Sequence, residues 1–408
     1  MTLSKGSPLP FDGNELDPLV ARPYGFFILN NFRNIIQIKL MISGISMENL
    51  KIKIAERTTP VVLPENLGFG LIFTDHVFEM DYAPDKSWHN ASIKPLRDLE
   101  LHPATMFIHY GQAVFEGLKA FKTASGEVVI FRPEKHIKRL NNSSKRICIP
   151  QVDVPFVLNA LKELVAIDKD WIPENKCEAL YIRPFIFGSD PFLGVKPSAN
   201  YRLLIILSPV GAYYPEGFKP VKILVQDDYV RAVRKGLGEC KTPANYAASL
   251  LAAEEAKKKG YTQVLWLDGI EQKYIEEVGT MNIFIRFRNE VVTPKLTGSI
   301  LPGVTRDSVI QILKDWGMNI TERLISLDEI ISEYKKGNLL EVFGTGTAAI
   351  ISSVGTLGYK DLEMKLNPVE AGELALKLFD ELTSIHSGLR KDIHNWLTYV
   401  DKKPVEVI

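Results

Sequence analysis

The feature that most constrains this chain is a pair of strand-like segments that carries two adjacent glutamates. The apolar run Gln263–Leu267 is followed by the turn-forming pair Asp268 and Gly269, and a second strand-like stretch then contains Glu276 and Glu277. This pattern predicts a β-hairpin that is mostly buried. Because neighbouring residues of a strand point to opposite faces, we expect one of the two carboxylates to face inward if the other faces water.

A carboxylate on a buried strand is unfavourable unless a cation or a hydrogen-bond donor meets it. No basic residue lies in the stretch Glu277–Phe284, so a partner for Glu277 must come from elsewhere in the fold or from a ligand. A protonated pyridine nitrogen would serve. The alternative is that Glu277 lies at a strand end and faces water, where it needs no partner.

The composition is that of an ordinary globular protein and excludes several classes of function. The chain has 408 residues, 46% of them hydrophobic and 24% charged, which allows two domains and a large core. With 49 basic and 49 acidic residues the formal net charge is +0, which gives no electrostatic signature of nucleic-acid or membrane binding. The three cysteines (Cys148, Cys177 and Cys240) and the seven histidines show no metal-ligand spacing, so we expect free thiols, a reducing compartment and no structural metal.

Residues 1–46 are open to three interpretations. Residues 1–17 are rich in Gly, Pro and polar residues, which predicts disorder. Residues 19–47 contain three basic residues and no acidic one, which weakly resembles a transit peptide, although acidic residues come just before. The apolar groups there are too short to span a bilayer. We favour the third interpretation, a dispensable extension ahead of a start at Met47, and we expect a cytoplasmic protein.

The rest of the chain mixes predicted strands and helices, which indicates an α/β or α+β protein. In the first half we expect strands at 71–82, 128–131, 180–186 and 201–208 and helices at 134–145 and 155–167, the second capped by Asp153. The Gly- and Pro-rich stretch 211–220 predicts a domain linker. In the second half we expect strands at 221–225 and 341–343 and helices at 247–259, 305–316, 327–335 and 368–385.

Several features of the second half fit a single ligand. Lys241 follows a Gly-rich turn and precedes an apolar helix, where loss of solvation would lower its pKa and free a nucleophilic amine. Tyr246 is close enough in sequence to return toward the same place. The alternatives are a solvated lysine and a packed aromatic residue.

Two further segments could bind an anion. Val304 and Thr305 begin a predicted helix, and helix N-termini bind phosphate through free N–H groups. The turn 344–347 offers backbone amides and hydroxyls. An ordinary helix cap and a plain turn are the alternatives. An amine, two anion cradles and the Glu277 carboxylate together fit pyridoxal phosphate.

The segment Glu277–Arg306 resembles the signature of class IV aminotransferases. It contains, in matching order and spacing, Glu277, Gly279, Asn282, Ile283, Phe284, Val291, Thr293, Leu301, Gly303, Val304 and Arg306. More closely, residues 66–396 resemble branched-chain amino acid aminotransferases. The matching segments are 109–111, 115–117, 131–133, 181–184, 210–213, 245–246, 263–267 and 301–306.

The resemblance implies a role for each matching residue. Lys241 would be the catalytic lysine, which holds the cofactor between turnovers and moves the substrate proton. Glu277 would pair with the pyridinium nitrogen and Tyr246 with the phenolic oxygen of the cofactor. The phosphate would be held by Arg139, the backbone of Val304 and Thr305, and Thr347.

The resemblance also implies a substrate pocket with an aromatic wall, formed by Tyr110, Phe115, Tyr181 and Tyr213. Arg183 and the Tyr110 hydroxyl would meet the side-chain carboxylate of glutamate, and amides near Thr347 and Ala348 would bind the α-carboxylate. Mammalian members carry a CxxC pair where this chain has Ala349 and Ser352, so we expect no thiol switch there.

We therefore predict a two-domain fold type IV enzyme of α/β (α+β) class, similar to D-amino acid aminotransferase. Residues 47–212 would form the small domain, 213–220 the linker and 221–408 the large domain that binds pyridoxal 5'-phosphate. The expected protein is a homodimer that transfers amino groups between L-leucine, L-isoleucine or L-valine and 2-oxoglutarate, with no nucleic-acid or membrane partner. The alternatives are a D-amino acid aminotransferase or aminodeoxychorismate lyase on the same scaffold, and a non-catalytic pyridoxal phosphate carrier.

Overall fold

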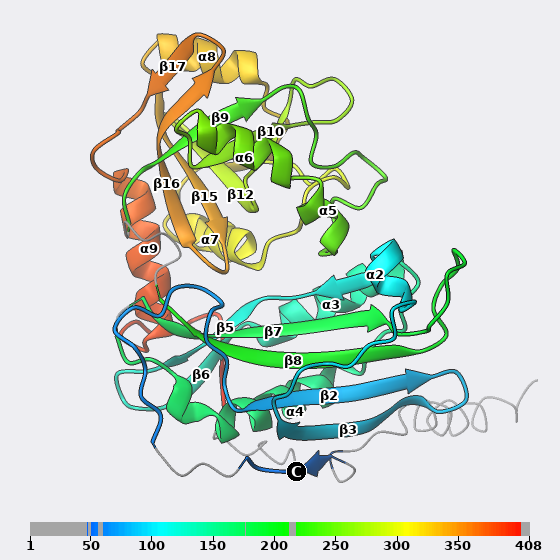
Figure 1. Cartoon of the computed structure of the whole chain (residues 1–408). Helices are drawn as coiled ribbons and strands as arrows, with labels where there is room; N and C mark the ends of the chain where they lie inside the picture. Colours follow the sequence, from blue (N-terminus) through cyan, green and yellow to red (C-terminus); the bar gives the residue numbers. More distant parts are fainter. Residues whose placement is uncertain (1–46, 48–49, 56–59, 176, 212–217, 401–408) are drawn as a thin grey trace, which may run out of the picture. The chain divides into compact units, whose positions relative to one another are not determined.

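The structure is a computed structural model that describes residue 47 and residues 50–55, 60–175, 177–211 and 218–400 (Figure 1). The described residues belong to one compact unit within residues 45–408. The predicted extension 1–46 lies outside the described residues. Among the described residues, no helix is long and apolar enough to cross a membrane, and the cytoplasmic location stays a prediction.

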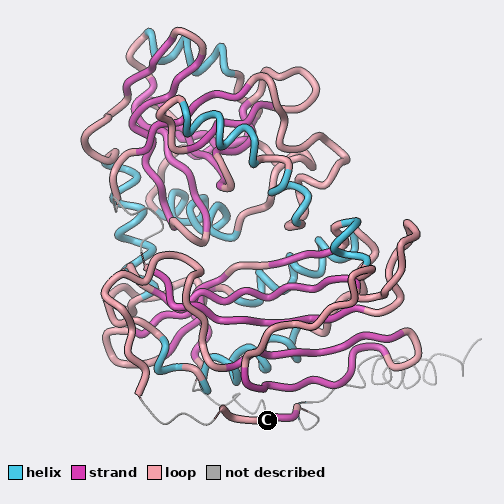
Figure 2. Tube along the Cα trace, viewed as in Figure 1, coloured by secondary structure: helices cyan, strands magenta, loops and turns pink. Residues whose placement is uncertain are grey.

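The first sheet, whose strands are labelled in Figure 1 and drawn in magenta in Figure 2, is almost entirely antiparallel. Only its edge pair, β1 with β3, is parallel. Its strand order is β1 (Lys51–Ile52), β3 (Ser87–Pro95), β2 (His76–Ala83), β8 (Tyr201–Val210), β7 (Ala179–Gly188), β5 (Leu118–Lys122), β6 (Val128–Phe131) and β18 (Leu397–Tyr399), with β4 (Ala113–Phe115) paired to β7.

The strands predicted in the first half are confirmed, with one shortened. The strand expected from residue 71 begins only at His76, because its partner β3 ends at Pro95, directly opposite His76. Leu71 and Phe73, which precede it, are exposed.

Two helices pack on this sheet through their apolar sides, α3 (Pro133–Arg146) and α4 (Val154–Ile167). The predicted cap of the second is present, because Asp153 accepts a hydrogen bond of 2.7 Å from the Phe156 N–H. Ile137 of α3 and Leu161 of α4 are fully buried with strand residues such as Ile205. Burial of such a side chain is worth roughly 1.5–3 kcal/mol. The short segments α2 (Met106–Tyr110) and η2 (Lys169–Trp171) lie in the connections.

The second sheet closes on itself. Its order is β11 (Ile275–Val278), β10 (Gln263–Leu267), β9 (Val221–Gln226), β16 (Ile350–Tyr359), β15 (Leu339–Gly346), β12 (Met281–Phe287), β13 (Val291–Pro294) and β14 (Ile320–Arg323), with β17 (Leu362–Lys365) beside β16. Because β11 also pairs with β12, the strands from β11 to β12 form a closed barrel. The hairpin predicted around Glu277 is the antiparallel pair of β10 and β11.

The second sheet is accompanied by α5 (Pro243–Ala247), α6 (Leu250–Lys258), α7 (Val304–Asp315), α8 (Leu327–Lys335) and α9 (Glu373–His386). The helix predicted at 247–259 is α6, which begins only at Leu250, and the short helix α5 precedes it. Ala252 and Ala256 of α6 pack on Trp266 of β10. Residues of α7 and α9, among them Val309 and Leu378, share a core with Phe343 of β15.

The chain returns to the first sheet after α9, because β18 pairs with β6. The predicted division at 47–212 and 221–408 places β18 with the second part of the chain instead. Most of the predicted linker, residues 213–217, lies outside the described residues. The domain boundaries therefore stay a prediction.

Candidate active site

A cavity of about 260 Å³ is lined by residues of both sheets and of the segments that follow their strands. Most of the predicted site residues line it. They are Phe115, Arg139, Tyr181, Arg183, Lys241, Tyr246, Glu277, Val304, Thr305, Thr347 and Ala348.

Two predicted residues are not among them. Tyr110, at the end of α2, is 41% exposed, and its hydroxyl donates a hydrogen bond to the Leu193 carbonyl oxygen. It is not among the residues that line the cavity of its own chain. Tyr213 lies outside the described residues.

Lys241 is held in place by its backbone. Its N–H donates to Ser143 Oγ of α3 at 2.9 Å, and its carbonyl oxygen accepts from the Phe115 N–H at 3.0 Å. Its Nζ lies 2.6 Å from the hydroxyl of Tyr246, which the short helix α5 carries back toward it. The pKa of Lys241 is lowered to about 8, mainly by burial and to a smaller extent by the positive charge of Arg139. An amine with such a pKa is a nucleophile near neutral pH.

Tyr246 is the hydrogen-bonding partner of that amine and remains a neutral phenol. The pKa of Tyr246 is raised to about 12, mainly by burial and to a smaller extent by the negative charge of Glu277. Its ring also packs against that of Phe115, with centroids 4.9 Å apart.

Glu277 is 3% exposed and receives a hydrogen bond of 2.7 Å from the Leu301 N–H. Burial raises the pKa of Glu277, and the charge of Arg231 acts in the opposite direction. The Arg231 Nε lies 3.4 Å from the carboxylate, so this residue is the basic partner that the sequence did not identify.

Glu276 and Glu277 are not divided between a buried face and a solvent face, because neither glutamate faces water. Both are 3% exposed. Trp266 of β10 pairs with Glu277, and Leu267 pairs with Ile275, so Glu276 is the extra residue of a β-bulge. A bulge breaks the alternation of the strand and can bury two successive side chains.

One end of the cavity combines a guanidinium with the N-terminus of a helix. Val304 and Thr305 form the first turn of α7, whose N-cap residue, Gly303, has no side chain to cap the free N–H groups. Arg139 lies beside this turn and donates to the Pro302 carbonyl oxygen at 3.0 Å. Thr347 lines the same cavity from the turn that follows β15.

Arg139 is fixed by a buried carboxylate, Glu116, which accepts from its Nε at 2.7 Å and its Nη2 at 2.9 Å. His136 Nδ1 lies 2.8 Å from the same carboxylate. Burial alone would raise the pKa of Glu116, but the charge and hydrogen bonds of Arg139 and His136 hold it well below its usual value. Sequence reasoning gave Glu116 no role, although the motif 115–117 contained it.

The opposite wall is aromatic and contains a cation. The Arg183 guanidinium lies 4.9 Å from the ring centroid of Phe115 and donates to the Tyr181 hydroxyl at 3.1 Å. Lys119, also missed from the sequence, donates from its buried Nζ to the Ala348 carbonyl oxygen at 2.8 Å. This bond holds the turn that carries Thr347 and Ala348.

Comparison with known proteins identifies the family. The family model of Amino-transferase class IV matches residues 113–355. Branched-chain-amino-acid aminotransferase 2 of Bacillus subtilis (strain 168) is 54% identical over 353 residues, which cover 86% of this chain and 97% of that protein. The chain belongs to the class IV aminotransferases. The predicted resemblance is thereby confirmed. The relatives of this chain favour a branched-chain aminotransferase over a D-amino acid aminotransferase or an aminodeoxychorismate lyase.

Solved structures agree with this aminotransferase fold, which confirms the predicted fold class. The Escherichia coli branched-chain amino acid aminotransferase matches with a TM-score of 0.68 and 27% identity, covering 80% of this chain and 100% of that chain. The T.th. branched-chain amino acid aminotransferase with pyridoxamine 5'-phosphate matches with a TM-score of 0.67 and 28% identity, covering 80% of this chain and 99% of that chain. Class IV aminotransferases are pyridoxal phosphate enzymes.

The aminotransferase site itself fits such a group. Thr345 lines the cavity, and its buried Oγ1 has no hydrogen-bond partner among the described residues. The uncapped first turn of α7, the Arg139 guanidinium and the Thr347 hydroxyl form a donor set that suits a phosphate. Glu277 supplies a buried acceptor for a protonated ring nitrogen.

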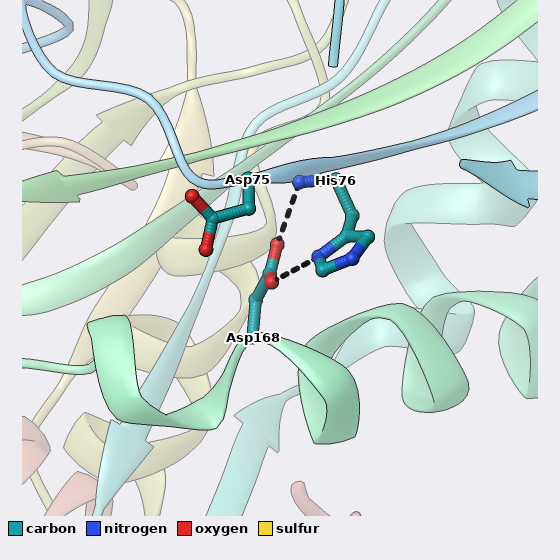
Figure 3. A group of neighbouring side chains, drawn as sticks. All are labelled: Asp75, His76 and Asp168. Carbon is teal, nitrogen blue, oxygen red and sulfur yellow. Dashed lines mark hydrogen bonds and ion pairs between the residues drawn. The ribbon is translucent and has the colours of Figure 1, made fainter. Parts of the chain in front are cut away.

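A second group of acidic and histidine side chains lies away from this cavity, at the start of β2 and the end of α4 (Figure 3). Asp75, His76 and Asp168 have potential ligand atoms within 4.8 Å of one another. However, His76 Nε2 accepts from the Ala55 N–H at 2.8 Å, and Nδ1 lies 2.6 Å from Asp168. Figure 3 shows the Asp168 carboxylate pointing at the His76 ring and the Asp75 carboxylate pointing away from it. Both ring nitrogens are already used, so this group fits a structural hydrogen-bond network rather than a metal site.

Proposed function

We propose that this chain is a pyridoxal phosphate-dependent transaminase for L-leucine, L-isoleucine and L-valine, with 2-oxoglutarate as the amino acceptor. The observation that carries the proposal is the placement of Lys241 and Tyr246, 2.6 Å apart, in the cavity that also contains Glu277 and the first turn of α7. A nucleophilic amine, a buried carboxylate and an anion cradle are the three parts that this chemistry requires.

Each part of the cofactor would meet different residues. Glu277 would meet the ring nitrogen, Tyr246 the phenolic oxygen, and Lys241 the reactive carbon. The phosphate would be held by Arg139, Thr347, the N–H groups of Val304 and Thr305, and the unpartnered hydroxyl of Thr345. When bound, the cofactor withdraws the electron pair that remains on the substrate Cα after its proton is removed.

The proton transfers fall to Lys241. Because burial and Arg139 lower its pKa to about 8, the neutral amine is available near physiological pH to accept the Cα proton. Tyr246, with its pKa raised to about 12, keeps its proton and stays a hydrogen-bond donor. The two residues therefore have separate tasks, one moving a proton and one holding a position.

The aromatic wall supports an aliphatic substrate. Phe115 and Tyr181 offer apolar surface to a branched side chain, and Phe69 packs on Tyr181 with centroids 5.0 Å apart. Arg183 lies within the same wall, so the pocket can also receive the side-chain carboxylate of glutamate. One pocket thus serves both halves of the reaction.

A homodimer would complete the pocket. Tyr110 is a predicted substrate residue that lies outside the cavity of its own chain. It is exposed together with Ile108, Phe192 and Leu193, which form an apolar surface around α2. We propose that this surface meets a second copy and that Tyr110 enters the cavity of that copy. A monomer of full activity in sedimentation and assay would contradict this arrangement.

An absorption spectrum before and after addition of L-leucine tests the function. The purified protein should show the visible band of lysine-bound pyridoxal phosphate, and L-leucine should convert it to the absorption of pyridoxamine 5'-phosphate. Conversion by D-alanine but not by L-leucine would support a D-amino acid aminotransferase instead. A full complement of cofactor with no conversion by any amino acid would support the carrier alternative.

A further inference from the structure

Glu276, the bulged residue beside Glu277, has a buried carboxyl group that the proposed function does not use. Its Oε1 accepts a hydrogen bond from the Ser299 hydroxyl, and its Oε2 is buried without a hydrogen-bond partner among the described residues. A buried carboxylate with one unpartnered oxygen is unfavourable, whereas a neutral carboxylic acid in the same place is tolerated.

The guanidinium of Arg231 acts electrostatically on both glutamates. The side chain of Arg231 is 8% exposed, and its Nε lies 3.4 Å from Glu277. Its Nη2 donates to the carbonyl oxygen of Ser299, the residue whose hydroxyl binds Glu276. Gly238 allows this close packing, because a Cβ at that position would collide with the same carbonyl oxygen.

The charges around Glu276 do not balance when Glu277 pairs with Arg231. Burial raises the pKa of Glu276 to about 7, and the negative charges of Glu277 and Asp268 add to the effect, opposed by Ser299 and Arg231. Asp268 needs no further cation, since four backbone N–H groups (Ile270, Glu271, Lys273 and Tyr274) donate to it. The other cations that act on Glu277 are Lys241 and Arg139, on the cavity side.

A path for a proton leads outward from Glu276. Ser299 Oγ lies 3.0 Å from Thr297 Oγ1, and either hydroxyl can donate. Ser299 is buried and Thr297 is partly exposed. If Glu276 is ionised, the Ser299 hydroxyl donates a hydrogen bond to it. If Glu276 is protonated, its carboxyl group donates to Ser299 Oγ, and Ser299 then donates to Thr297, so that both hydrogen bonds have changed direction. The pair of hydroxyls can therefore pass a proton from the buried acid toward solvent.

We propose that Glu276 is a positioning residue that releases a proton when the cofactor binds and then becomes the anion paired with Arg231. Glu276 is neutral while Arg231 compensates Glu277. A protonated ring nitrogen at Glu277 supplies a second cation, Arg231 is then shared with Glu276, and the Glu276 proton leaves through Ser299 and Thr297. Two carboxylates and two cations result, with no unpaired charge. The inference rests on the proposed role of Glu277.

The test is the number of protons exchanged when the cofactor-free protein binds pyridoxal 5'-phosphate, measured calorimetrically in buffers of different ionisation enthalpy. Proton exchange by the cofactor itself is common to all variants, so the difference between wild type and Glu276→Gln isolates Glu276. With a pKa of about 7, the wild type should release about half a proton more at pH 7 and about nine-tenths of a proton more at pH 6, with no difference at pH 9. The control Glu239→Gln, an exposed acid nearby, should match the wild type.

A second measurement needs no cofactor. Because the pKa of folded Glu276 is raised, its ionisation destabilises the folded state, so the stability it contributes is complete below about pH 4.5 and is lost as the pH rises through 7. Glutamine resembles the neutral acid, so Glu276→Gln should fold and its thermal midpoint should fall less between pH 5 and pH 8.

The outcomes separate the two proposals. Equal proton release by wild type and Glu276→Gln would overturn the inference, even if the stability difference is present. Failure of wild-type protein to bind the cofactor would overturn the proposed function and this inference together.

Discussion

Replacement of Glu116 by glutamine tests how the phosphate end of the site is built. Glu116 is fully buried and accepts two hydrogen bonds from Arg139, whose side chain is 8% exposed. Glutamine keeps the shape but removes the negative charge and turns one acceptor into a donor. Arg139 is then a buried cation with one poorly matched partner.

The magnitude follows from burial. An exposed ion pair contributes about 0–1 kcal/mol, whereas removal of one partner of a buried pair costs about 3–5 kcal/mol. Because the side chains of Glu116 and Arg139 are almost fully buried, this is a buried ion pair. We expect Glu116→Gln to lower the stability of the cofactor-free protein by about 3–5 kcal/mol. The loss should be smaller when a bound phosphate supplies a new anion for Arg139.

The assay is the thermal midpoint with and without pyridoxal 5'-phosphate. Glu134→Gln is the matched control, since Glu134 lies on the same helix as Arg139 and its ion pair with Lys138 is exposed. We expect a large drop for Glu116→Gln without cofactor, a larger recovery with cofactor than in wild type, and a change below about 1 kcal/mol for the control. Equal midpoints for the two variants would refute the reasoning.

Three further predictions concern other parts of the protein. With the pKa of Lys241 lowered to about 8, the rate at which cofactor-free protein reacts with pyridoxal 5'-phosphate should rise with pH up to about 8 and then level off; a rise that continues to pH 10 would contradict the placement of Lys241. Arg183→Ala should lower kcat/KM for glutamate at least about tenfold more than for leucine, since only glutamate has a second carboxylate. Steady-state assays with each amino acid measure the two losses. Equal losses for glutamate and leucine would show that Arg183 has no such role. Dialysis against a chelator should leave the thermal midpoint unchanged, because hydrogen bonds already occupy both ring nitrogens of His76, and a drop of several degrees would indicate a bound metal there.

Much of the site could be predicted because its residues lie in short motifs. Lys241 and Tyr246 are neighbours in sequence, and one turn of helix α5 is enough to bring them together. The burial of the hairpin that carries Glu277 could be predicted from its apolar residues, whereas the sequence left open whether the Glu277 carboxylate faces inward. Local patterns of this kind depend on few long-range contacts.

The remainder depends on register and packing, which a single sequence does not determine. The bulge at Glu276 arises from the pairing of β11 with β10, and this extra residue lets two successive glutamates be buried. Arg231 and Glu116 act through partners distant in sequence. The pairing of β18 with β6 places Leu397 opposite Phe131, from the other half of the chain.

The central claim is that Lys241 is the residue that holds the cofactor. Reduction of the loaded protein with borohydride would fix the cofactor to its lysine, and mass spectrometry of the peptides would locate it. We predict a single modified lysine, Lys241, with modification lost when L-leucine is added before the reductant. Modification of another lysine, or of none in protein that retains the cofactor, would contradict the account.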